Sequence, residues 1–253
     1  MAIINDMKPR GIDLAYSQLP FDQGKVELEK AGYRVISLEE NARLRIQEGK
    51  SADVSRSGNW VREDFLYVPK RDKVIFTKNS PIMKHAIEAT QANRDGKEFY
   101  VDEQEVQKAL GDSIDVSYSQ KPIPTKRFGE NEITVFAFGD EKKAQEYGAF
   151  LKEAGISEMP LWIVDNKYVN EQENFFVRKL WFRYLGNWSV LDGDNRYLYC
   201  DYRVRGVRGV CEANEPQKNL GNVTRYTLED IEKALEESGF SGAKKGLFEK
   251  LGK

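Results

Sequence analysis

The most constraining feature of this 253-residue chain is a 32-residue segment, Leu180 to Cys211, that contains no Lys, Glu, Gln or Met. The whole chain has 23 Lys, 25 Glu and 10 Gln. At that composition, a segment of this length would hold about seven of them. The segment keeps five Arg, three Asp and four Tyr. Any fold for this chain must therefore accommodate a long segment of aromatic and polar side chains with an unusual charge content. This segment is called the cassette below.

Two explanations fit the composition of the cassette. One is a buried sheet segment that excludes charge, although burial removes Arg and Asp as readily as Lys and Glu. The other lies in the genetic code. Randomising both adenines of an Asn codon yields Asn, Asp, Tyr, Ser, Gly, Arg, Cys, His, Val and Leu among its products. It never yields Lys, Glu, Gln, Met or Trp, so Trp188 requires a different codon, such as AGG with its adenine changed.

The cassette also carries a family resemblance. Its sequence from Leu180 to Val207, closed by an Arg-Gly-Val element at 208–210, resembles the variable region of diversity-generating retroelement variable proteins. The likeness is strongest to their archaeal, nanoarchaeal-type group, and the upstream segments Tyr33–Asn41 and Thr77–Ile82 look like that group too. In such proteins a reverse transcriptase copies an adenine-containing template with errors and rewrites the cassette. The resemblance implies a C-type-lectin-like fold that displays the rewritten residues as a ligand-binding surface.

Net charge and the distribution of apolar residues argue against several classes of function. The formal net charge is −2, and no cluster of Lys and Arg offers a footprint for phosphates, so we expect no nucleic-acid partner. There is no apolar run of about 18 residues, which predicts no membrane span. The first ten residues are too polar for a secretory signal. We therefore expect a cytoplasmic protein, or display at the cell surface by a route that leaves no mark here.

Helix signals occur at four places. Ser37 and Glu40 form a capping pair ahead of an apolar face, and Ser80 precedes a proline at a first helical position. Asp140 can cap a third helix, which Gly155 stops. A last amphipathic helix is expected from Thr227 to Gly239, where it could brace the cassette.

Strands are expected at seven places: 65–68, 74–77, 98–101, 133–138, 161–164, 177–183 and 204–210. Strands and helices do not alternate as strict βαβ units, so α+β is the predicted class. We expect a single domain over 1–253, with 112–129 as the most plausible internal boundary because it contains two prolines. The variable region within it is 180–211.

Framework positions are predicted inside the cassette. Leu185, Leu191, Leu198, Val204 and Val207 are expected to point inward between polar positions. Trp181 and Phe182 are expected in the core, and Gly193 and Gly206 suit tight turns or close backbone approach. The positions between them form the predicted ligand-binding set: Tyr184, Gly186, Asn187, Trp188, Val190, Asp192, Asp194, Asn195, Arg196, Tyr197, Tyr199, Asp201, Tyr202 and Arg203.

The residue types in this set favour a protein or cell-surface component as the partner. Tyr gives large contact area at low entropic cost, and Ser, Gly and Asn adapt their hydrogen bonds, as in antibody paratopes. Arg and Trp are frequent binding hot spots. The alternative is a long, turn-rich connection with ordinary surface aromatics.

No catalytic, metal or cofactor site is predicted. The acidic run Asp192–Asn195 has its glycine in the wrong place for an EF-hand and lacks the closing Glu, so it predicts a turn. His85, the only histidine, has no nucleophile motif to serve. One rival function is an oxidase of the formylglycine-generating type that uses Cys200 and Cys211, which could also pair as a disulfide. Another is an invariant structural or scaffold protein.

Overall fold

The structure is a computed structural model that describes residues 4–5, 13–186 and 189–208. Every described residue lies in one compact unit that spans residues 1–211. The internal boundary suggested at 112–129 falls inside this unit, where residues 113–117 form a strand of the main sheet. The helix expected after Thr227 lies outside the described residues.

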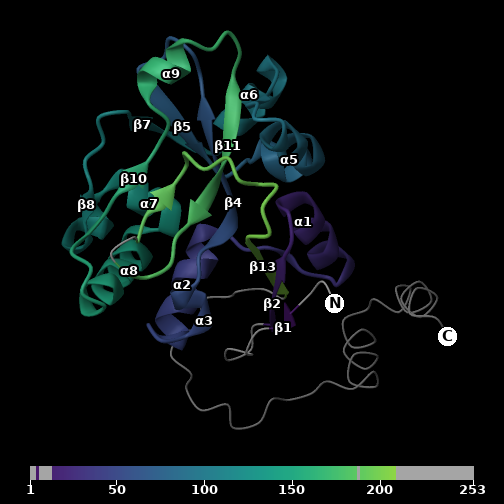
Figure 1. The fold of residues 1–253 in the computed structure, drawn as a ribbon. Helices are drawn as coiled ribbons and strands as arrows, with labels where there is room; N and C mark the ends of the chain where they lie inside the picture. The colour runs from purple at the N-terminus through teal and green to yellow at the C-terminus, as the bar shows by residue number, and fades with distance from the viewer. Residues whose placement is uncertain (1–3, 6–12, 187–188, 209–253) are drawn as a thin grey trace, which may run out of the picture. The chain divides into compact units, whose positions relative to one another are not determined.

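The helices of the unit surround a large sheet (Figure 1). Their bounds are α1 Phe21–Lys30, α2 Leu38–Glu48, α3 Asp53–Arg56, α4 Pro81–Lys84, α5 Ala86–Arg94, α6 Glu103–Leu110, the 3₁₀ helix η1 Thr125–Glu130, α7 Glu132–Phe138, α8 Glu141–Glu153 and α9 Asn166–Asn170. Among the described residues, no helix is both long and apolar enough to cross a membrane.

The strands are mostly short. Their bounds are β1 Ile4–Asn5, β2 Asp13–Gln18, β3 Arg34–Val35, β4 Asn59–Tyr67, β5 Lys73–Thr77, β6 Phe99–Tyr100, β7 Ser113–Ser117, β8 Ile123–Pro124, β9 Glu158–Met159, β10 Leu161–Trp162, β11 Phe176–Phe182, β12 Leu191–Asp192 and β13 Arg203–Arg208.

Eleven of the described strands form one mixed sheet, whose main path runs β1-β2-β13-β4-β11-β12-β10. The long antiparallel pair β4–β11 lies at its centre, with β5 and β7 beyond β4 on one side. Strand β13 pairs antiparallel with β2 and meets β4 in parallel at Val204 and Trp60. Both ends of the cassette are therefore built into the middle of the sheet.

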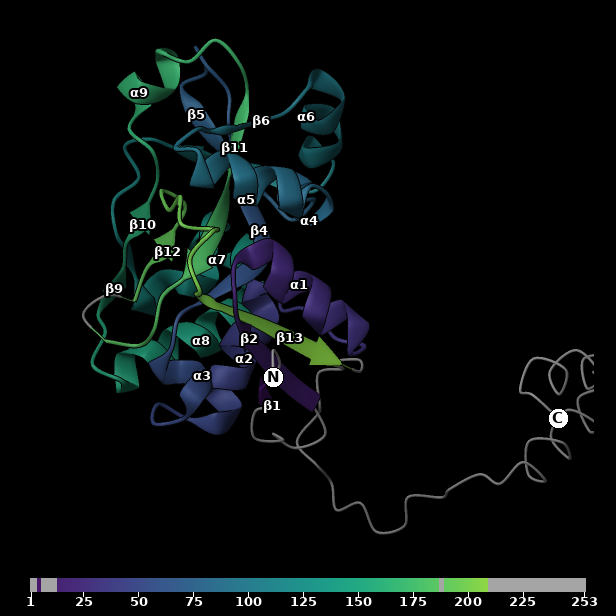
Figure 2. The same cartoon turned by 45° about the vertical axis from the view of Figure 1, so that its right-hand side comes forward.

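Hydrophobic cores cover both faces of the central strands. One core joins α2, α7 and α8 to side chains such as Phe65 and Phe182, and the other joins α1, α4, α5 and α6 to side chains such as Trp60 and Val177. Figures 1 and 2 show these two helix groups on opposite sides of β4 and β11. Because successive strand residues point to opposite faces, the apolar runs in β4 and β11 supply both cores.

One expected strand is wrong. The segment 133–138, predicted as a strand from its β-branched and aromatic residues, forms helix α7. The side chain of Asn131 accepts hydrogen bonds from the backbone N–H groups of Ile133 and Thr134, at 3.1 and 3.2 Å. Gly139, with φ of 108°, ends the helix. The N-cap and the C-terminal glycine outweighed the strand propensity of the residues between them.

The other expected strands overlap observed ones. The segments at 65–68, 74–77, 98–101, 161–164, 177–183 and 204–210 overlap β4, β5, β6, β10, β11 and β13, with residues 209 and 210 outside the described part. The Ser37–Glu40 capping box is present at the start of α2. The helix predicted from Ser80 breaks at His85 into α4 and α5. Residues 21–30 and 103–110, for which no helix was predicted, form α1 and α6.

Candidate functional site

Most of the cassette forms a long excursion from the sheet, the cassette loop, which comprises residues 183–202. It leaves the end of β11, contributes the short strand β12, and returns to β13 (Figure 2). Strand β12 pairs with β11 on one side and with β10 on the other. Beyond this two-residue strand, the described part of the loop has no regular secondary structure. Its path must therefore be fixed by contacts with the rest of the protein, called the frame below.

Two buried frame side chains hold the main chain of the loop. The guanidinium of Arg45, on α2, donates to the carbonyl oxygen of Arg183 at 2.7 Å. The hydroxyl of Tyr67, on β4, donates to the carbonyl oxygen of Gly193 at 2.9 Å. Both side chains have 0% relative exposure. They contact backbone atoms, which every residue type provides, so the Arg45 anchor does not depend on the side chain at 183.

Backbone-to-backbone contacts anchor the loop at further points. The N–H of Phe21, at the start of α1, donates to the carbonyl of Leu198 at 2.7 Å. The N–H of Leu185 donates to the carbonyl of Ser55, in α3, also at 2.7 Å. These contacts join the loop to helices on the two faces of the sheet without using cassette side chains.

Glycine 193 marks the tightest approach between loop and frame. A Cβ atom at this position would lie 2.1 Å from the Phe65 ring. At Gly206, in β13, a Cβ would lie 2.9 Å from the side chains of Leu28 and Tyr33. The prediction of close backbone approach at both glycines is confirmed.

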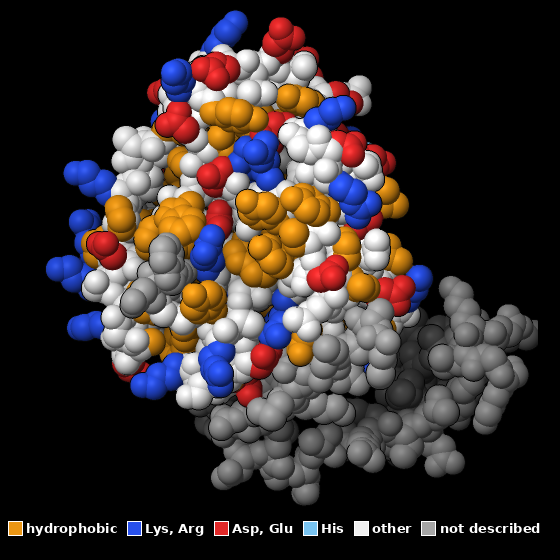
Figure 3. All heavy atoms as spheres, in the orientation of Figure 1, with side chains coloured by type: hydrophobic (Ala, Val, Ile, Leu, Met, Phe, Trp, Pro, Cys, Tyr) orange, Lys and Arg blue, Asp and Glu red, His pale blue; other side chains and the backbone are white. Residues whose placement is uncertain are grey.

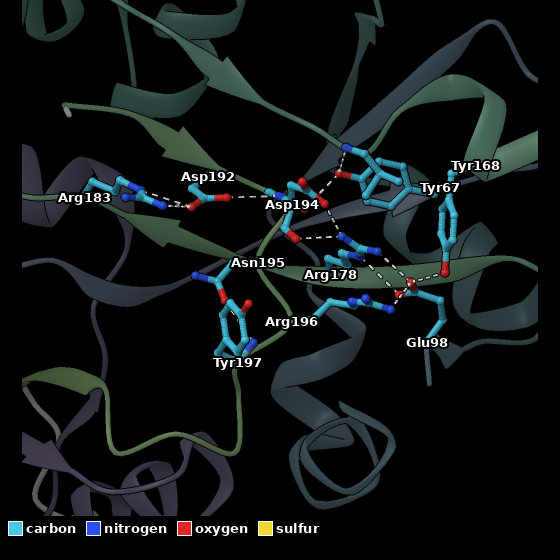
Figure 4. A network of polar contacts seen from close by, with 12 residues as sticks. Tyr67, Glu98, Tyr168, Arg178, Arg183, Asp192, Asp194, Asn195, Arg196 and Tyr197 are labelled. Atoms are coloured by element: carbon cyan, nitrogen blue, oxygen red, sulfur yellow. Dashed lines mark hydrogen bonds and ion pairs between the residues drawn. The ribbon is translucent and has the colours of Figure 1, made fainter. Parts of the chain in front are cut away.

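An ionic network lies beneath the middle of the loop (Figure 4). The buried guanidinium of Arg178 contacts both carboxylate oxygens of Glu98, at 2.6 and 3.1 Å, and donates to the carbonyl of Asp194 at 2.6 Å. It also pairs with the Asp194 carboxylate. The hydroxyl of Tyr168 donates to Glu98 at 2.7 Å, and Arg196 reaches the same carboxylate at 3.4 Å. Burial lowers the pKa of Arg178, but the hydrogen bonds and charge of Glu98 outweigh it, so the net shift is upward.

The predicted ligand-binding residues divide by exposure. Exposed members are Tyr184, Asp194, Arg196, Tyr197, Asp201 and Tyr202; half-buried members are Gly186, Tyr199 and Arg203; buried members are Val190, Asp192 and Asn195; Asn187 and Trp188 lie outside the described residues. Six of the fourteen positions therefore present their side chains openly at the surface.

Three positions expected on the surface are buried, so the expectation of display is wrong for them. Asp192, 3% exposed, accepts hydrogen bonds from Arg183 at 2.8 and 3.1 Å. Burial raises the pKa of the Asp192 carboxyl, and the Arg183 guanidinium opposes that rise. The side-chain oxygen of Asn195 accepts from the N–H of Tyr197 at 2.9 Å and shapes a turn. Val190 packs inside with an exposure of 1%.

The half-buried Arg203 is also engaged inside the protein. Its guanidinium pairs with Asp53, at the start of α3, and lies 4.0 Å from the centre of the Tyr16 ring. The neighbouring buried Arg205 contacts the same carboxylate at 2.7 Å. This end of the cassette is thus held by side chains as well as by strand pairing.

The framework expectations largely hold. Leu191, Leu198, Val204 and Val207 are buried, whereas Leu185 is only partly buried against the core. Phe182 is in the core that contains Phe65, and Trp181 is partly buried against the other core, which contains Trp60.

An aromatic cluster reaches from the core to the exposed side of the loop. The ring centroids of Trp60 and Trp181 are 4.9 Å apart, and Tyr202 lies 5.1 Å from Trp181. Tyr197 lies 6.4 Å from Tyr202 and is 50% exposed. Figure 3 shows hydrophobic side chains gathered at the centre of this face, with acidic and basic groups among them. Such a mixture of rings and charges suits contact with another macromolecule.

A pocket of about 450 Å³ lies beside this cluster. Its lining residues are Asn93, Gly96, Val164, Asp165, Tyr168, Arg178, Asp194, Arg196, Tyr197 and Tyr199. Four of them belong to the predicted ligand-binding set. The remaining six come from the frame, and none of them was predicted from the sequence as a site residue.

Cys200, the thiol of the oxidase alternative, is half-buried beside Tyr202. Burial raises the pKa of this thiol, and the nearby Asp201 charge raises it further. Reactive cysteines need the opposite shift, toward thiolate. Cys211 lies outside the described residues. Within the described ranges, no three His, Cys, Asp or Glu side chains are grouped closely enough to hold a metal ion.

Comparisons with known proteins support the fold. No family model matches the chain, and no curated protein matches it. A solved structure reported as "Accommodation of massive sequence variation in Nanoarchaeota by the C-type lectin fold" is similar, with a TM-score of 0.58 and 15% sequence identity. The match covers 79% of this chain and 99% of the other. The expected α+β class is confirmed, and the chain has a C-type lectin fold.

Proposed function

We propose that this protein is a non-enzymatic binding protein that contacts another protein or a cell-surface component through the exposed face of its cassette loop. We further propose that adenine-directed retroelement mutagenesis diversifies this face. Six residues form its proposed contact set: Tyr184, Asp194, Arg196, Tyr197, Asp201 and Tyr202.

The observation that carries the proposal is how the frame holds the loop. Arg45, Tyr67 and the N–H of Phe21 all contact carbonyl oxygens of the cassette. A main-chain anchor survives a change of the side chain at the same position wherever there is room for one, which Gly193 lacks. Exposed substitutions usually change the free energy of unfolding by no more than about 0.5 kcal/mol. The fold can therefore keep its loop in place while the exposed side chains differ.

The composition of the cassette supports diversification in particular. Its lack of Lys, Glu, Gln and Met is what randomised adenines of Asn codons would leave. The burial explanation fits less well, because Arg205 is fully buried and Asp192 nearly so, while six polar or aromatic residues of the loop are exposed. The neighbouring fold supports the same proposal, since the report on that structure concerns massive sequence variation.

A pair of libraries tests directly whether the fold tolerates substitutions at the exposed positions of the loop. The first randomises the six exposed positions, and the matched control randomises Val190, Asp192 and Asn195. Each library is displayed and sorted for resistance to protease. We expect most members of the first library to stay folded and most of the control library to be cleaved. Equal losses in the two libraries would contradict the proposed division of the loop.

Sequencing of the locus across its source population tests diversification itself. Variation is expected to concentrate between Tyr184 and Arg203, at codons that bear adenines in a nearby template copy. If these codons vary no more than those of the core residues Ile82 and Leu151, the protein is an invariant binding or scaffold protein. The diversification proposal then fails, although binding through the same face could still be measured.

A further inference from the structure

The pocket beside the aromatic cluster has two walls of different origin. The cassette wall consists of Asp194, Arg196, Tyr197 and Tyr199. The frame wall consists of Asn93 and Gly96 at the end of α5, and Val164, Asp165 and Tyr168 at the start of α9. Arg178 lines the pocket as well and is bound to Glu98 and Asp194 (Figure 4). A ligand in this pocket would touch residues inside and outside the cassette together.

Asn93 is the unusual member of the frame wall. It is only 7% exposed, yet its side-chain amide forms no hydrogen bond with any described residue. The amide is not one of the fully buried polar groups of the described residues that lack a partner, so it keeps access to solvent. Asn93 lines an open pocket of about 450 Å³, a volume typical of ligand sites. Asn93 is therefore placed to bond with whatever enters.

The buried charged groups beside the pocket are already bound by other protein groups. Glu98, 4% exposed, is bound by Arg178, by the Tyr168 hydroxyl and by Arg196. Arg178 in turn uses its other nitrogen on Asp194. The uncommitted side chain of Asn93 is thus a neutral amide with one acceptor and a pair of donor hydrogens. A peptide group offers the complementary N–H and C=O, as in other sites that capture extended peptides through main-chain bonds.

We infer that the frame wall is a peptide subsite in which the Asn93 amide hydrogen-bonds a main-chain peptide group of the partner protein. The cassette wall contacts the partner's side chains, with Tyr197 and Tyr199, whose ring centroids are 6.2 Å apart, supplying contact area. This inference rests on the proposed function of the cassette face. It adds a recognition element that stays the same when the cassette changes, because it reads what all peptides share.

Peptide selection provides the test. A random 12-residue peptide library is panned on the full chain, and three unrelated binders are synthesised with blocked ends. Their Kd values are measured by calorimetry on the parent protein and on Asn93→Leu, which keeps the side-chain size but removes the amide. The control is Thr90→Ala on the same helix, since the Thr90 hydroxyl is buried without a partner and does not line the pocket. Tyr197→Ala reports on the cassette wall.

We expect Asn93→Leu to weaken all three peptides at least tenfold, and Thr90→Ala to leave them unchanged. Each peptide is also N-methylated at one position at a time. At one position, methylation should weaken binding to the parent but have no further effect on Asn93→Leu, because both changes remove the same hydrogen bond. If Asn93→Leu does not fold, Asn93→Asp, which removes the donor with little change of shape, takes its place.

The remaining outcomes separate this inference from the proposed function. If Tyr197→Ala weakens binding but the Asn93 variants do not, the frame subsite is wrong and the cassette face stands. If neither change weakens binding, the peptides bind elsewhere and both ideas fail for this face. If no peptide is selected while a glycan array gives binding that Tyr197→Ala abolishes, the peptide class is wrong and the face is correct.

Discussion

The central strand pair β4–β11 and the cassette loop are held in place by opposite means. In the strand pair, buried side chains bond to one another: the Lys179 ammonium contacts the Asp64 carboxylate at 2.8 Å, and both side chains are 0% exposed. In the loop, frame groups bond to the main chain, as Tyr67 does to Gly193. The first arrangement fixes the identity of both residues. The second fixes the position of the chain and leaves many side chains free to change.

The largest effect is expected where buried charges meet. Lys179→Met would leave the Asp64 carboxylate buried without its cation, which costs about 3–5 kcal/mol of unfolding free energy. Urea denaturation followed by circular dichroism measures this loss. The double variant Lys179→Met with Asp64→Asn should recover part of it, because no uncompensated charge remains. Additive losses in the double variant would contradict the coupling.

A second prediction concerns how stability depends on pH through Glu63, which neighbours Asp64 in β4. Burial raises the pKa of Glu63 to about 7 from an ordinary 4.5, despite the N–H of Leu38 and the charge of Lys179, which lower it. The folded state therefore binds more protons than the unfolded state between these values. The stabilising contribution of Glu63 is complete below pH 4.5 and is lost as pH rises to about 7.

The loss amounts to about 3 kcal/mol, since each pH unit of the window corresponds to about 1.4 kcal/mol. Glu63→Gln can still accept from the Leu38 N–H but does not ionise. Melting temperatures from pH 4 to pH 8 should therefore fall less steeply for the variant than for the parent. Parallel curves would show that the carboxyl titrates with an ordinary pKa.

Removing one anchor of the cassette loop should lower the free energy of unfolding by a smaller amount. Tyr67→Phe keeps the ring stacked on Phe176, with centroids 4.8 Å apart, but removes the hydroxyl bonded to Gly193 and Val164. An unsatisfied buried carbonyl costs about 1–3 kcal/mol. Hydrogen exchange should quicken in the cassette loop more than in β5. A uniform change across the sheet would contradict a local anchoring role.

The smallest effect is expected on the exposed face. Tyr197→Ala should change the unfolding free energy by no more than about 0.5 kcal/mol, because the side chain is half exposed. Tyr202→Ala should cost more, since that ring packs 5.1 Å from Trp181. Thermal melts compare the two variants. A Tyr197→Ala melt as low as that of a core truncation would show that this ring belongs to the framework.

Local sequence signals predicted much of the scaffold. Helix α2 follows from its Ser37–Glu40 capping box, because a cap acts within four residues. Segment 133–138 shows the limit of such signals, since its strand propensity competed with a helix cap at Asn131 and lost. Helix α1 begins after Pro20 with no side-chain cap, so it lacked a clear start signal.

Of the two walls of the pocket, only the cassette wall could be predicted from the sequence. The cassette wall of the pocket belongs to a segment with an unusual composition, which could be identified without a structure. The frame wall combines Asn93 and Tyr168, which are distant in sequence and ordinary in type. Nothing local marks either residue, because their importance comes only from their position beside the loop.

The sequence by itself determined which segment differs from the rest of the chain, that Leu191, Leu198, Val204 and Val207 of that segment face inward, and that the backbone approaches its neighbours closely at Gly193 and Gly206. These properties follow from composition and from the size of side chains. The tertiary structure alone decided which polar cassette residues are exposed. The cassette loop has no regular period that would predict which side chains point inward. Asp192 points inward because it bonds to Arg183, and Asn195 does so because it accepts from the N–H of Tyr197. Asp194 and Tyr197 remain at the surface.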